Sequence, residues 1–295
     1  MAENIAIIPA HKIDHSKWNA CVRNACNGLI YASADYLDQL ADNWTGLVIN
    51  DYETIMPIPW RRKYGIRYAY DVPFVQQLGI FTKSKQAPVA NMIAAMFTFC
   101  KYGDYHFNFE NVVAHSTSRT NYVLPLNHAI ANNFSEGTRQ NIKRSEKFEL
   151  RYLHGSIEEA VNIYQSFYGT AITHVPGNTF ENFKSACKQL QQQVIIRKMV
   201  DGHQNTMAIA LLLRDNRRLY NIMNTTVPQG RATEANYSLL SNIFSEFKDS
   251  GLLFDFEGSD IDGIGHFYKK FGAINQPYPS FHFNCLPWPL NLIKK

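Results

Sequence analysis

A segment near the C-terminus constrains the fold of this chain more than any other, because it combines a strand, a polar loop and a short helix. Residues 252–256 are apolar apart from Asp255, and the acidic and small residues Glu257 and Gly258 follow at once. Residues 264–271 then have apolar side chains at helical spacing, and Gly272 ends the helix. Strand ends suit catalytic groups, because the sheet fixes them while the loop leaves them open.

The length and apolar content of the chain allow a large core. The chain has 295 residues, of which 45% are hydrophobic and 13% aromatic. We therefore expect two domains of middling size and exclude a disordered or fibrous protein. The formal charge of +4, from 29 basic and 25 acidic residues, is too small to indicate a nucleic-acid or membrane partner by itself.

The cysteines and the N-terminal residues indicate the cellular compartment of the protein. The five cysteines are widely scattered and form no CxxC pair, so we expect no disulfide framework. Residues 1–9 lack the basic start and long apolar stretch of a signal peptide, and no later segment has the roughly 18 continuous apolar residues that span a bilayer. These features predict a cytoplasmic protein without a membrane span.

The expected elements follow a similar order in the two halves of the chain. In each half, two helices precede an antiparallel run of strands, and a long helix and another strand follow it. In the second half the antiparallel strands, the long helix and the last strand are expected at residues 194–200, 206–214, 217–226, 232–248 and 280–285. The similarity is one of element order and not of residues.

Two segments resemble one group of proteins. The strand and loop described above, with the Phe-Tyr-Lys-Lys-Phe-Gly-Ala run at residues 267–273, resemble the end of an acyltransferase domain of the GNAT superfamily. The resemblance is closer to the FemAB-like branch, whose members carry two such domains in tandem. The Thr-Arg-Gln-Asn-Ile-Lys-Arg run at residues 138–144 resembles the helix that joins the two domains in that branch.

The resemblance implies both a fold class and a reaction. We expect an α/β (α+β) protein of two tandem GNAT-like domains, each a mixed, mostly antiparallel sheet flanked by helices. The first domain is assigned to residues 1–131, mainly from element order, and the second to residues 132–295, which open with the linker helix. The implied reaction is acyl or aminoacyl transfer to an amine acceptor.

Two residues of the C-terminal segment are candidates for proton transfer. The resemblance implies that Tyr268 protonates the leaving group, and a phenol with an ordinary pKa of about 10 is protonated at neutral pH. Glu257 is the candidate base, or the group that orients the attacking amine. In the alternative interpretation, Tyr268 belongs to a buried aromatic stripe with Phe267 and Phe271, and Glu257 caps a turn or pairs with a cation.

The donor site is expected around the Val-Pro-Gln-Gly-Arg-Ala run at residues 227–232. The corresponding family loop, Gln/Arg-x-x-Gly-x-Gly/Ala, binds pyrophosphate with the amides of a helix N-terminus. Val227 departs from this pattern, and Pro228 removes an amide, which weakens the case for coenzyme A. Both acyl-CoA and aminoacyl-tRNA stay open as the donor substrate. The expected donor-binding residues are Asn224, Gly230, Arg231, Ala232 and Thr233, although Gly230 alone also fits a simple tight turn.

Basic residues supply the expected acceptor site. The resemblance implies that Arg61, Arg62, Arg139 and Arg144 hold an anionic small-molecule or peptide-bearing acceptor, and tRNA is a possible partner. Residues 60–70 mix four positive charges with aromatic side chains, as in proteins that bind single-stranded nucleic acid. The same pattern also suits a solvated hairpin tip beside a core sheet. No HExxH or paired-cysteine pattern accompanies the histidines, so no metal site is expected.

Three functions are therefore open. The first is an N-acyltransferase of the GNAT or FemAB-like type. The second is a noncatalytic binding protein of the same fold that recognises an anionic ligand such as a nucleotide sugar or RNA, and Val227 favours it. The third is an RNA-binding module that uses residues 60–70, whose affinity falls steeply with salt.

Overall fold

The computed structural model describes residues 4–84, 87–169, 177–258 and 260–293. The chain divides into two compact units. The first unit is made of Met1–Arg119 and Pro277–Lys295, and the second is Thr120–Gln276. Each unit contains one sheet with helices packed on it, which is the expected α/β class with mostly antiparallel strands.

The first unit has a sheet with the strand order β1-β2-β3-β4-β6-β15-β7, and β5 pairs with β3. All of these pairs are antiparallel except β4 with β6. The strands are β1 Ile5–Pro9, β2 Trp44–Ile49, β3 Thr54–Lys63, β4 Ile66–Ala69, β5 Phe81–Thr82, β6 Tyr102–His106, β7 Thr117–Arg119 and β15 Tyr278–Asn284. The helices are α1 His15–Asn24, α2 Ala34–Leu40, α3 Val89–Phe99 and α10 Leu290–Ile293.

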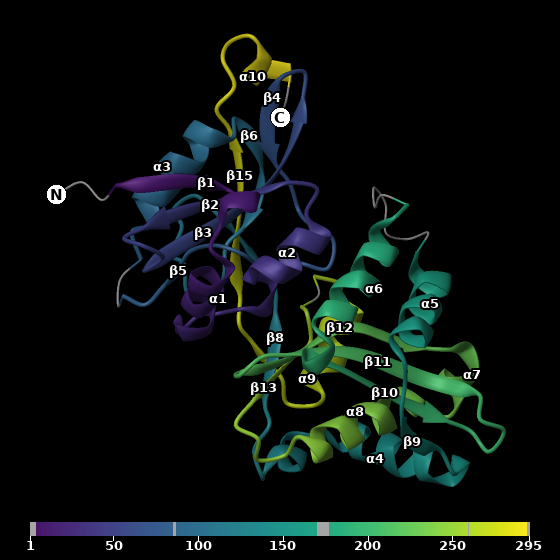
Figure 1. The fold of residues 1–295 in the computed structure, drawn as a ribbon. Helices are drawn as coiled ribbons and strands as arrows, with labels where there is room; N and C mark the ends of the chain where they lie inside the picture. The colour runs from purple at the N-terminus through teal and green to yellow at the C-terminus, as the bar shows by residue number, and fades with distance from the viewer. Residues whose placement is uncertain (1–3, 85–86, 170–176, 259, 294–295) are drawn as a thin grey trace. The chain divides into compact units, whose positions relative to one another are not determined.

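The hairpin of β2 and β3 forms the centre of the first unit. Every residue of β2 is buried, because helices cover the strands from both sides, with α3 on one side and α1 and α2 on the other (Figure 1). The chain turns at Asn50 and Asp51, which both have positive φ, a conformation that Asn and Asp tolerate better than most residues. The sequence predicted this turn.

Strand β15 returns the C-terminus to the first unit. A last strand was predicted at residues 280–285 within the second domain, but β15 pairs with β6 on one edge and with β7 on the other. Phe281 and Phe283 also pack against Phe97 of α3, at ring-centroid distances of 6.0 and 4.9 Å. Because of this pairing, the boundaries of the compact units fall after Arg119 and after Gln276 rather than at residue 131.

The second unit has a sheet with the strand order β14-β8-β13-β12-β11-β10-β9. Figure 1 shows α5 and α6 on one face of this sheet and α4 and α8 on the other. The strands are β8 Tyr122–Pro125, β9 Arg151–His154, β10 Val194–Val200, β11 Thr206–Arg214, β12 Arg218–Thr226, β13 Leu253–Asp255 and β14 Ile274–Asn275. The helices are α4 Glu136–Ser145, α5 Ile157–Tyr168, α6 Thr179–Gln189, α7 Pro228–Ala232, α8 Ala235–Glu246 and α9 Asp262–Lys269.

Helix α8 lies on the core of the second unit. Its apolar face, which includes Leu239, Ile243 and Phe244, is fully buried and belongs to one cluster with Ala208 and Ala210 of β11. The small alanine side chains let the helix approach the sheet closely. Burying this face is the main source of stability for the helix, at about 25 cal/mol per Å² of apolar surface.

The long helix predicted at residues 232–248 corresponds to α8, and a separate short helix, α7, precedes it. Pro228 begins α7, as proline suits the first helical position. Glu234 then has φ 54°, in the left-handed region, and separates α7 from α8. The expected donor loop at residues 227–232 is therefore mostly a short helix.

Helix α4, predicted as a linker helix, is bound into the second unit. Ser135 caps it by accepting a hydrogen bond from the Thr138 amide at 3.2 Å, which is a typical N-cap. The Thr138 hydroxyl donates to the Lys270 carbonyl oxygen at 3.0 Å, and Ile142 packs against the core cluster. The basic run was therefore correctly predicted to be helical, and its apolar face holds it on the second unit.

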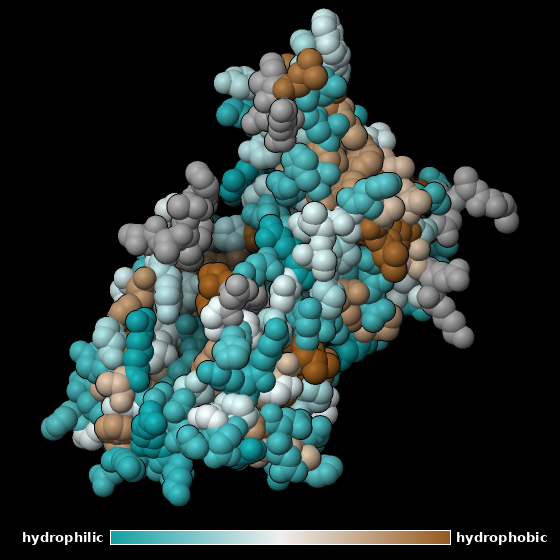
Figure 2. Space-filling model, turned by 180° about the vertical axis from the view of Figure 1, so that it is seen from behind, coloured by the Kyte–Doolittle hydropathy of each residue, from teal (hydrophilic) through white to brown (hydrophobic). Residues whose placement is uncertain are grey.

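The surface is mostly hydrophilic on the face drawn in Figure 2, where hydrophobic residues form small separate groups. Among the described residues, no helix has the length and apolar character needed to cross a membrane.

Candidate functional site

The sheet of the second unit opens where β12 and β13 part. The two strands run parallel and pair at Arg218, Leu219 and Tyr220. Strand β13 then ends at Asp255, whereas β12 continues to Thr226. The edge of β12 from residue 221 onward thus loses β13 as its neighbour, and a ligand can approach this edge.

A bulge in β12 lies at the point of separation. Leu211 of β11 pairs with Met223 and Leu213 pairs with Tyr220, so residues 221 and 222 oppose the single residue 212. A bulge of this kind re-aims side chains by one position along the strand. It explains why Asn221 and Asn224, three residues apart, line the same pocket.

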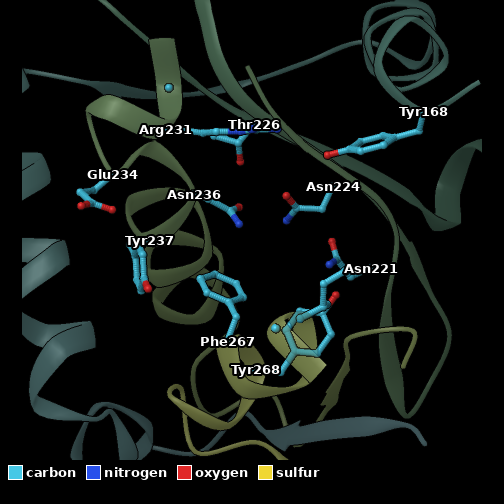
Figure 3. Close-up of a pocket in the computed structure, with 13 residues that line it drawn as sticks. Tyr168, Asn221, Asn224, Thr226, Arg231, Glu234, Asn236, Tyr237, Phe267 and Tyr268 are labelled. Atoms are coloured by element: carbon cyan, nitrogen blue, oxygen red, sulfur yellow. The ribbon is translucent and has the colours of Figure 1, made fainter. Parts of the chain in front are cut away.

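That pocket has a cavity volume of about 340 Å³. Its walls come from β12, from the segment that joins β12 to α8, from the start of α8, and from α5 and α9 (Figure 3). The lining residues are Tyr168, Asn221, Asn224, Thr226, Gly230, Arg231, Glu234, Asn236, Tyr237, Gly263, Ile264, Phe267 and Tyr268.

Four residues predicted for the site line this pocket. Asn224, Gly230 and Arg231 were predicted to bind the donor, and Tyr268 was predicted to be the acid. Ala232 and Thr233 were also predicted to bind the donor, but they are not among the described residues that line this pocket. Thr233 borders a neighbouring cavity and donates its hydroxyl to the Gly230 carbonyl at 3.1 Å.

Gly230 is required by a close approach between α7 and β11. A Cβ atom at this position would lie 1.9 Å from the Met207 carbonyl oxygen, far inside van der Waals contact. The Val227 amide donates to the same carbonyl at 3.1 Å, and Pro228 has no amide to offer. Helix α7 therefore packs tightly on the sheet, and neither Val227 nor Pro228 offers an amide to a phosphate.

Tyr268 is held by aromatic packing and is half buried. Its ring stacks on Phe256 at a centroid distance of 4.4 Å and meets Tyr122 edge-on at 6.0 Å. Burial, followed by the negative charge of Glu257, raises the pKa of Tyr268 above its ordinary value. The hydroxyl is thus protonated at neutral pH, as a general acid requires, and its role as the acid stays a prediction.

Glu257 follows β13 and has a left-handed backbone, with φ 66°. Its amide donates to Asp255 Oδ1 at 3.1 Å. The side chain is partly buried, and burial raises the pKa of Glu257 to about 8, so this carboxyl is mainly protonated at pH 7. It lies outside the set of described residues that line the pocket, although its ionised form raises the pKa of Tyr268.

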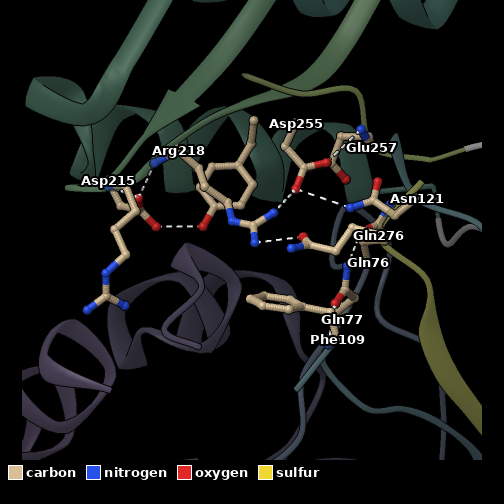
Figure 4. Close-up of polar contacts among 11 residues, drawn as sticks. Gln76, Gln77, Phe109, Asn121, Asp215, Arg218, Asp255, Glu257 and Gln276 are labelled. Atoms are coloured by element: carbon tan, nitrogen blue, oxygen red, sulfur yellow. Dashed lines mark hydrogen bonds and ion pairs between the residues drawn. The ribbon is translucent and has the colours of Figure 1, made fainter. Parts of the chain in front are cut away.

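A buried ion pair fixes the start of the opening between the strands (Figure 4). Arg218 donates to Asp255 Oδ2 at 2.8 Å, and the two side chains are 4% and 1% exposed. The guanidinium also donates to Gln276 Oε1 at 2.8 Å, and Asn121 Nδ2 donates to Asp255 at 3.3 Å. These hydrogen bonds offset the desolvation of the two charges, and Asp255 in turn holds the Glu257 amide.

The two arginines of α4 have different surroundings. Arg144 donates to Glu234 Oε1 at 3.1 Å, and Glu234 lines the pocket, so Arg144 lies one contact away from it. Arg139 lies 3.7 Å from Glu136 on the same helix and is exposed. Their role in binding an acceptor stays a prediction.

Arg61 and Arg62 belong to the first unit. They were predicted at a hairpin tip, but β3 extends through them to Lys63, and the turn is made by Tyr64 and Gly65. Arg61 pairs with Asp42 and lies over the Tyr70 ring, with Cζ 4.1 Å from its centroid. Arg62 donates to the Gly65 carbonyl at 3.0 Å. Their role in the acceptor site also stays a prediction.

The described residues contain no group of three or more His, Cys, Asp or Glu side chains arranged to hold a metal ion. His15 instead lies 3.3 Å from Asp35 and 3.3 Å from Asp38, in the first turn of α1.

Several lining residues were missed by the sequence analysis. Asn221, Asn236, Tyr168 and Tyr237 come from three elements. The one available signal was Asn221 on an otherwise apolar strand that also carries Asn224, because a polar side chain on a buried strand needs a partner.

Comparison with solved structures identifies the fold. FemX aligns over 96% of this chain and 98% of its own, with a TM-score of 0.68 and 10% identity. L-PGS from Bacillus licheniformis aligns over 95% of both chains, with a TM-score of 0.59 and 11% identity. This chain has the FemAB-like fold of tandem GNAT-type domains.

A further structure with this FemAB-like fold is the C-terminal domain of a putative lysylphosphatidylglycerol synthetase from Agrobacterium fabrum. It covers 95% of this chain and 94% of its own, with a TM-score of 0.58 and 10% identity. No family model and no curated protein sequence matches the chain. The likeness to these structures is one of fold over nearly the whole chain, at 10–11% sequence identity.

Proposed function

We propose that the chain transfers an acyl or aminoacyl group to an amine, with the pocket beside β12 as the reaction site. The observation that carries this proposal is the lining of one pocket, at the open edge of β12, by Asn224, Gly230, Arg231 and Tyr268. The FemAB-like fold supports the same reaction class, although a fold alone admits many functions.

In the proposed reaction, the amine attacks the carbonyl carbon of the donor, and the bond from that carbon to the leaving oxygen or sulfur breaks. The protonated Tyr268 hydroxyl gives its proton to the leaving atom. We keep Glu257 as the proposed proton acceptor or orienting group for the amine. Because its pKa is about 8, its share as a base increases as the pH rises toward and above 8.

An aminoacyl-tRNA donor is favoured over acyl-CoA. Pyrophosphate binding in GNAT-type domains relies on free amides at the start of the helix after the open strand. Here the Val227 amide already donates to Met207, the Arg231 amide donates to Val227, and Pro228 has none. Val227 and Pro228 therefore offer no amide to a pyrophosphate.

The test is a transfer assay on the full chain. Labelled aminoacyl-tRNA and labelled acetyl-CoA are each offered with a panel of amines that carry a phosphate or carboxylate, and the labelled amide product is measured. We expect product from aminoacyl-tRNA and little from acetyl-CoA. Product from neither donor would contradict the proposed reaction.

The departure of Val227 from the family loop favours the second candidate, a noncatalytic protein that binds an anionic ligand in this pocket. A thermal-shift screen against nucleotide sugars separates the two, because a ligand that binds the folded state raises the melting temperature. A rise with a nucleotide sugar, together with no transfer from either donor, would favour the binding protein.

A further inference from the structure

Two carboxamide oxygens line the pocket without a hydrogen-bond partner. Asn221 is 5% exposed, and its Oδ1 and that of Asn236 accept no hydrogen bond from the described residues. Buried polar atoms in folded proteins nearly always have a partner, since leaving one unsatisfied costs free energy. Oxygens of this kind in a pocket wall indicate that a ligand supplies the missing donors.

Asn221 of β12 and Asn236 of α8 line the same pocket. The bulge at residues 221 and 222 brings Asn221 to the side of β12 that also carries Asn224. Figure 3 shows the side chains of Asn224 and Asn236 pointing toward each other across the pocket, with Asn221 between Asn224 and Tyr268. Asn221 therefore lies on the pocket wall beside the proposed acid.

The chemistry of this wall selects the group that can occupy it. A carboxamide oxygen accepts hydrogen bonds from N–H or O–H groups, whereas an alkyl chain would bury the oxygen without a donor. A site built to hydrogen-bond a substrate group rejects the analogue that lacks the group much more strongly than an apolar pocket rejects a different alkyl group. An amine or a hydroxyl thus satisfies this wall, and a methylene does not.

We propose that Asn221 and Asn236 form a specificity subsite that takes a hydrogen-bond-donating group of the substrate, an amine or a hydroxyl, next to Tyr268. The subsite disfavours an unbranched alkyl chain at that place. This inference rests on the proposed function for the location of the reaction, and it adds the class of substrate group and the residues that select it.

Three small probes with one carbon skeleton test the subsite directly. L-Alaninamide carries an ammonium group, lactamide a hydroxyl and propionamide only hydrogen at the same carbon. Binding to the full chain labelled with ¹⁵N-asparagine is followed by the shifts of the side-chain amide signals. We expect alaninamide or lactamide, or both, to bind about tenfold more tightly than propionamide, the factor that one hydrogen bond typically contributes. The comparison of the first two probes distinguishes an amine from a hydroxyl.

Substitution of the subsite residues supplies the matched controls. Asn221→Leu keeps the size of the side chain and removes its acceptor. The ratio of the affinities for alaninamide or lactamide and for propionamide should therefore fall to near one. Asn236→Leu should also reduce the preference for the hydrogen-bond-donating probes. It replaces Asn221→Leu in the test if that variant does not fold. The control is Asn242→Leu on the same helix, where Nδ2 donates to the Ser238 carbonyl at 2.8 Å; this variant should keep the preference.

The outcomes separate the subsite from the proposed reaction. Equal binding of the three probes, no shift of either side-chain amide, or a preference that survives both leucine substitutions would overturn the subsite. A preference that depends on Asn221, found together with no transfer from any donor, would support the subsite and contradict the reaction. Transfer without any preference among the probes would support the reaction and contradict the subsite.

Discussion

At the scale of single residues, burial sets the proton chemistry of the site. Tyr268 lies among aromatic rings that desolvate its hydroxyl, and Glu257 is desolvated at the end of β13. Desolvation disfavours the charged form of both groups, so both pKa values rise. The tyrosine therefore stays a proton donor at all physiological pH values, whereas the glutamate changes its charge near pH 8.

Removing the Tyr268 hydroxyl tests its role as the acid. Tyr268→Phe keeps the stacking on Phe256, so the melting temperature should change little, while the turnover number should fall by roughly 10²- to 10⁴-fold. Tyr237→Phe is the matched control, since Tyr237 lines the same pocket from α8. Turnover in the assay described above is measured for both variants. An equal loss in both, or no loss in Tyr268→Phe, would remove the assigned role.

Glu257 should make the protein less stable as the pH rises. Its pKa is about 8 in the folded chain, against an ordinary value of 4.5. Between these two values the folded state holds a proton that the unfolded state has lost. The free energy of unfolding therefore decreases from about pH 4.5 to about pH 8 through this group.

The measurement is urea unfolding of the wild type and of Glu257→Gln at pH 5, 7 and 9. Glutamine stays neutral, so the variant should gain stability relative to the wild type as the pH rises. A difference between the two proteins that does not change with pH would show that the carboxyl is not desolvated in the folded chain.

At the scale of elements, the separation of β12 from β13 makes the pocket, and α7 closes one side of it. The separation starts beside the buried pair of Arg218 and Asp255, which ties the two strands together just before they part. Helix α7 is held against β11 by the contact at Gly230. The pocket thus depends on the ion pair between the strands and on the contact of α7 with β11.

A side chain at Gly230 should deform the pocket. In Gly230→Ala the new Cβ would clash with the Met207 carbonyl, so α7 must move away from β11. We expect a loss of stability of about 1–3 kcal/mol by overpacking and a weaker affinity for the donor. Urea unfolding measures the loss of stability, and a binding assay with the donor measures the change in affinity.

Gly263→Ala is the matched control for stability. Gly263 also lines the pocket, but a Cβ there would meet no atom within 4 Å. Alanine favours a helix by up to about 1 kcal/mol over glycine, so this variant should be as stable as the wild type or more stable. Equal losses in the two variants would contradict the role assigned to the contact with Met207.

At the scale of the whole molecule, the chain leaves the first unit, builds the second and returns. Strand β15 lies between β6 and β7 in the first sheet, so the first unit is complete only when its last segment is present. The second unit is continuous in sequence, from Thr120 to Gln276. The two units therefore depend differently on the C-terminus.

Truncation after Gln276 should unfold the first unit and spare the second. It removes the strand that pairs with both β6 and β7 and exposes Phe97, which packs on Phe281 and Phe283. Limited proteolysis with mass spectrometry should show rapid cleavage before residue 119 and a protected fragment from about residue 120 onward. Protection of both units in the truncated chain would contradict the structural role of β15.

Much of the second unit could be predicted from local patterns. The strand at residues 206–214 and the strand, loop and helix after residue 252 follow from the periodicity of apolar residues, and glycine marks the end of the last helix. The short helix α7 was missed, since a loop was expected at residues 227–232, and the left-handed backbone of Glu234 that separates α7 from α8 has no strong local signal.

The amino-acid sequence alone therefore determined the fold class, the order of the elements and four lining residues of the pocket, because these follow from short-range spacing and from family motifs. The tertiary structure decided which sheet β15 joins, where β12 and β13 part, and that Asn221 faces the pocket. These features depend on the register between strands far apart in the sequence. Such a register is set by the packing of whole elements, and no local pattern records it.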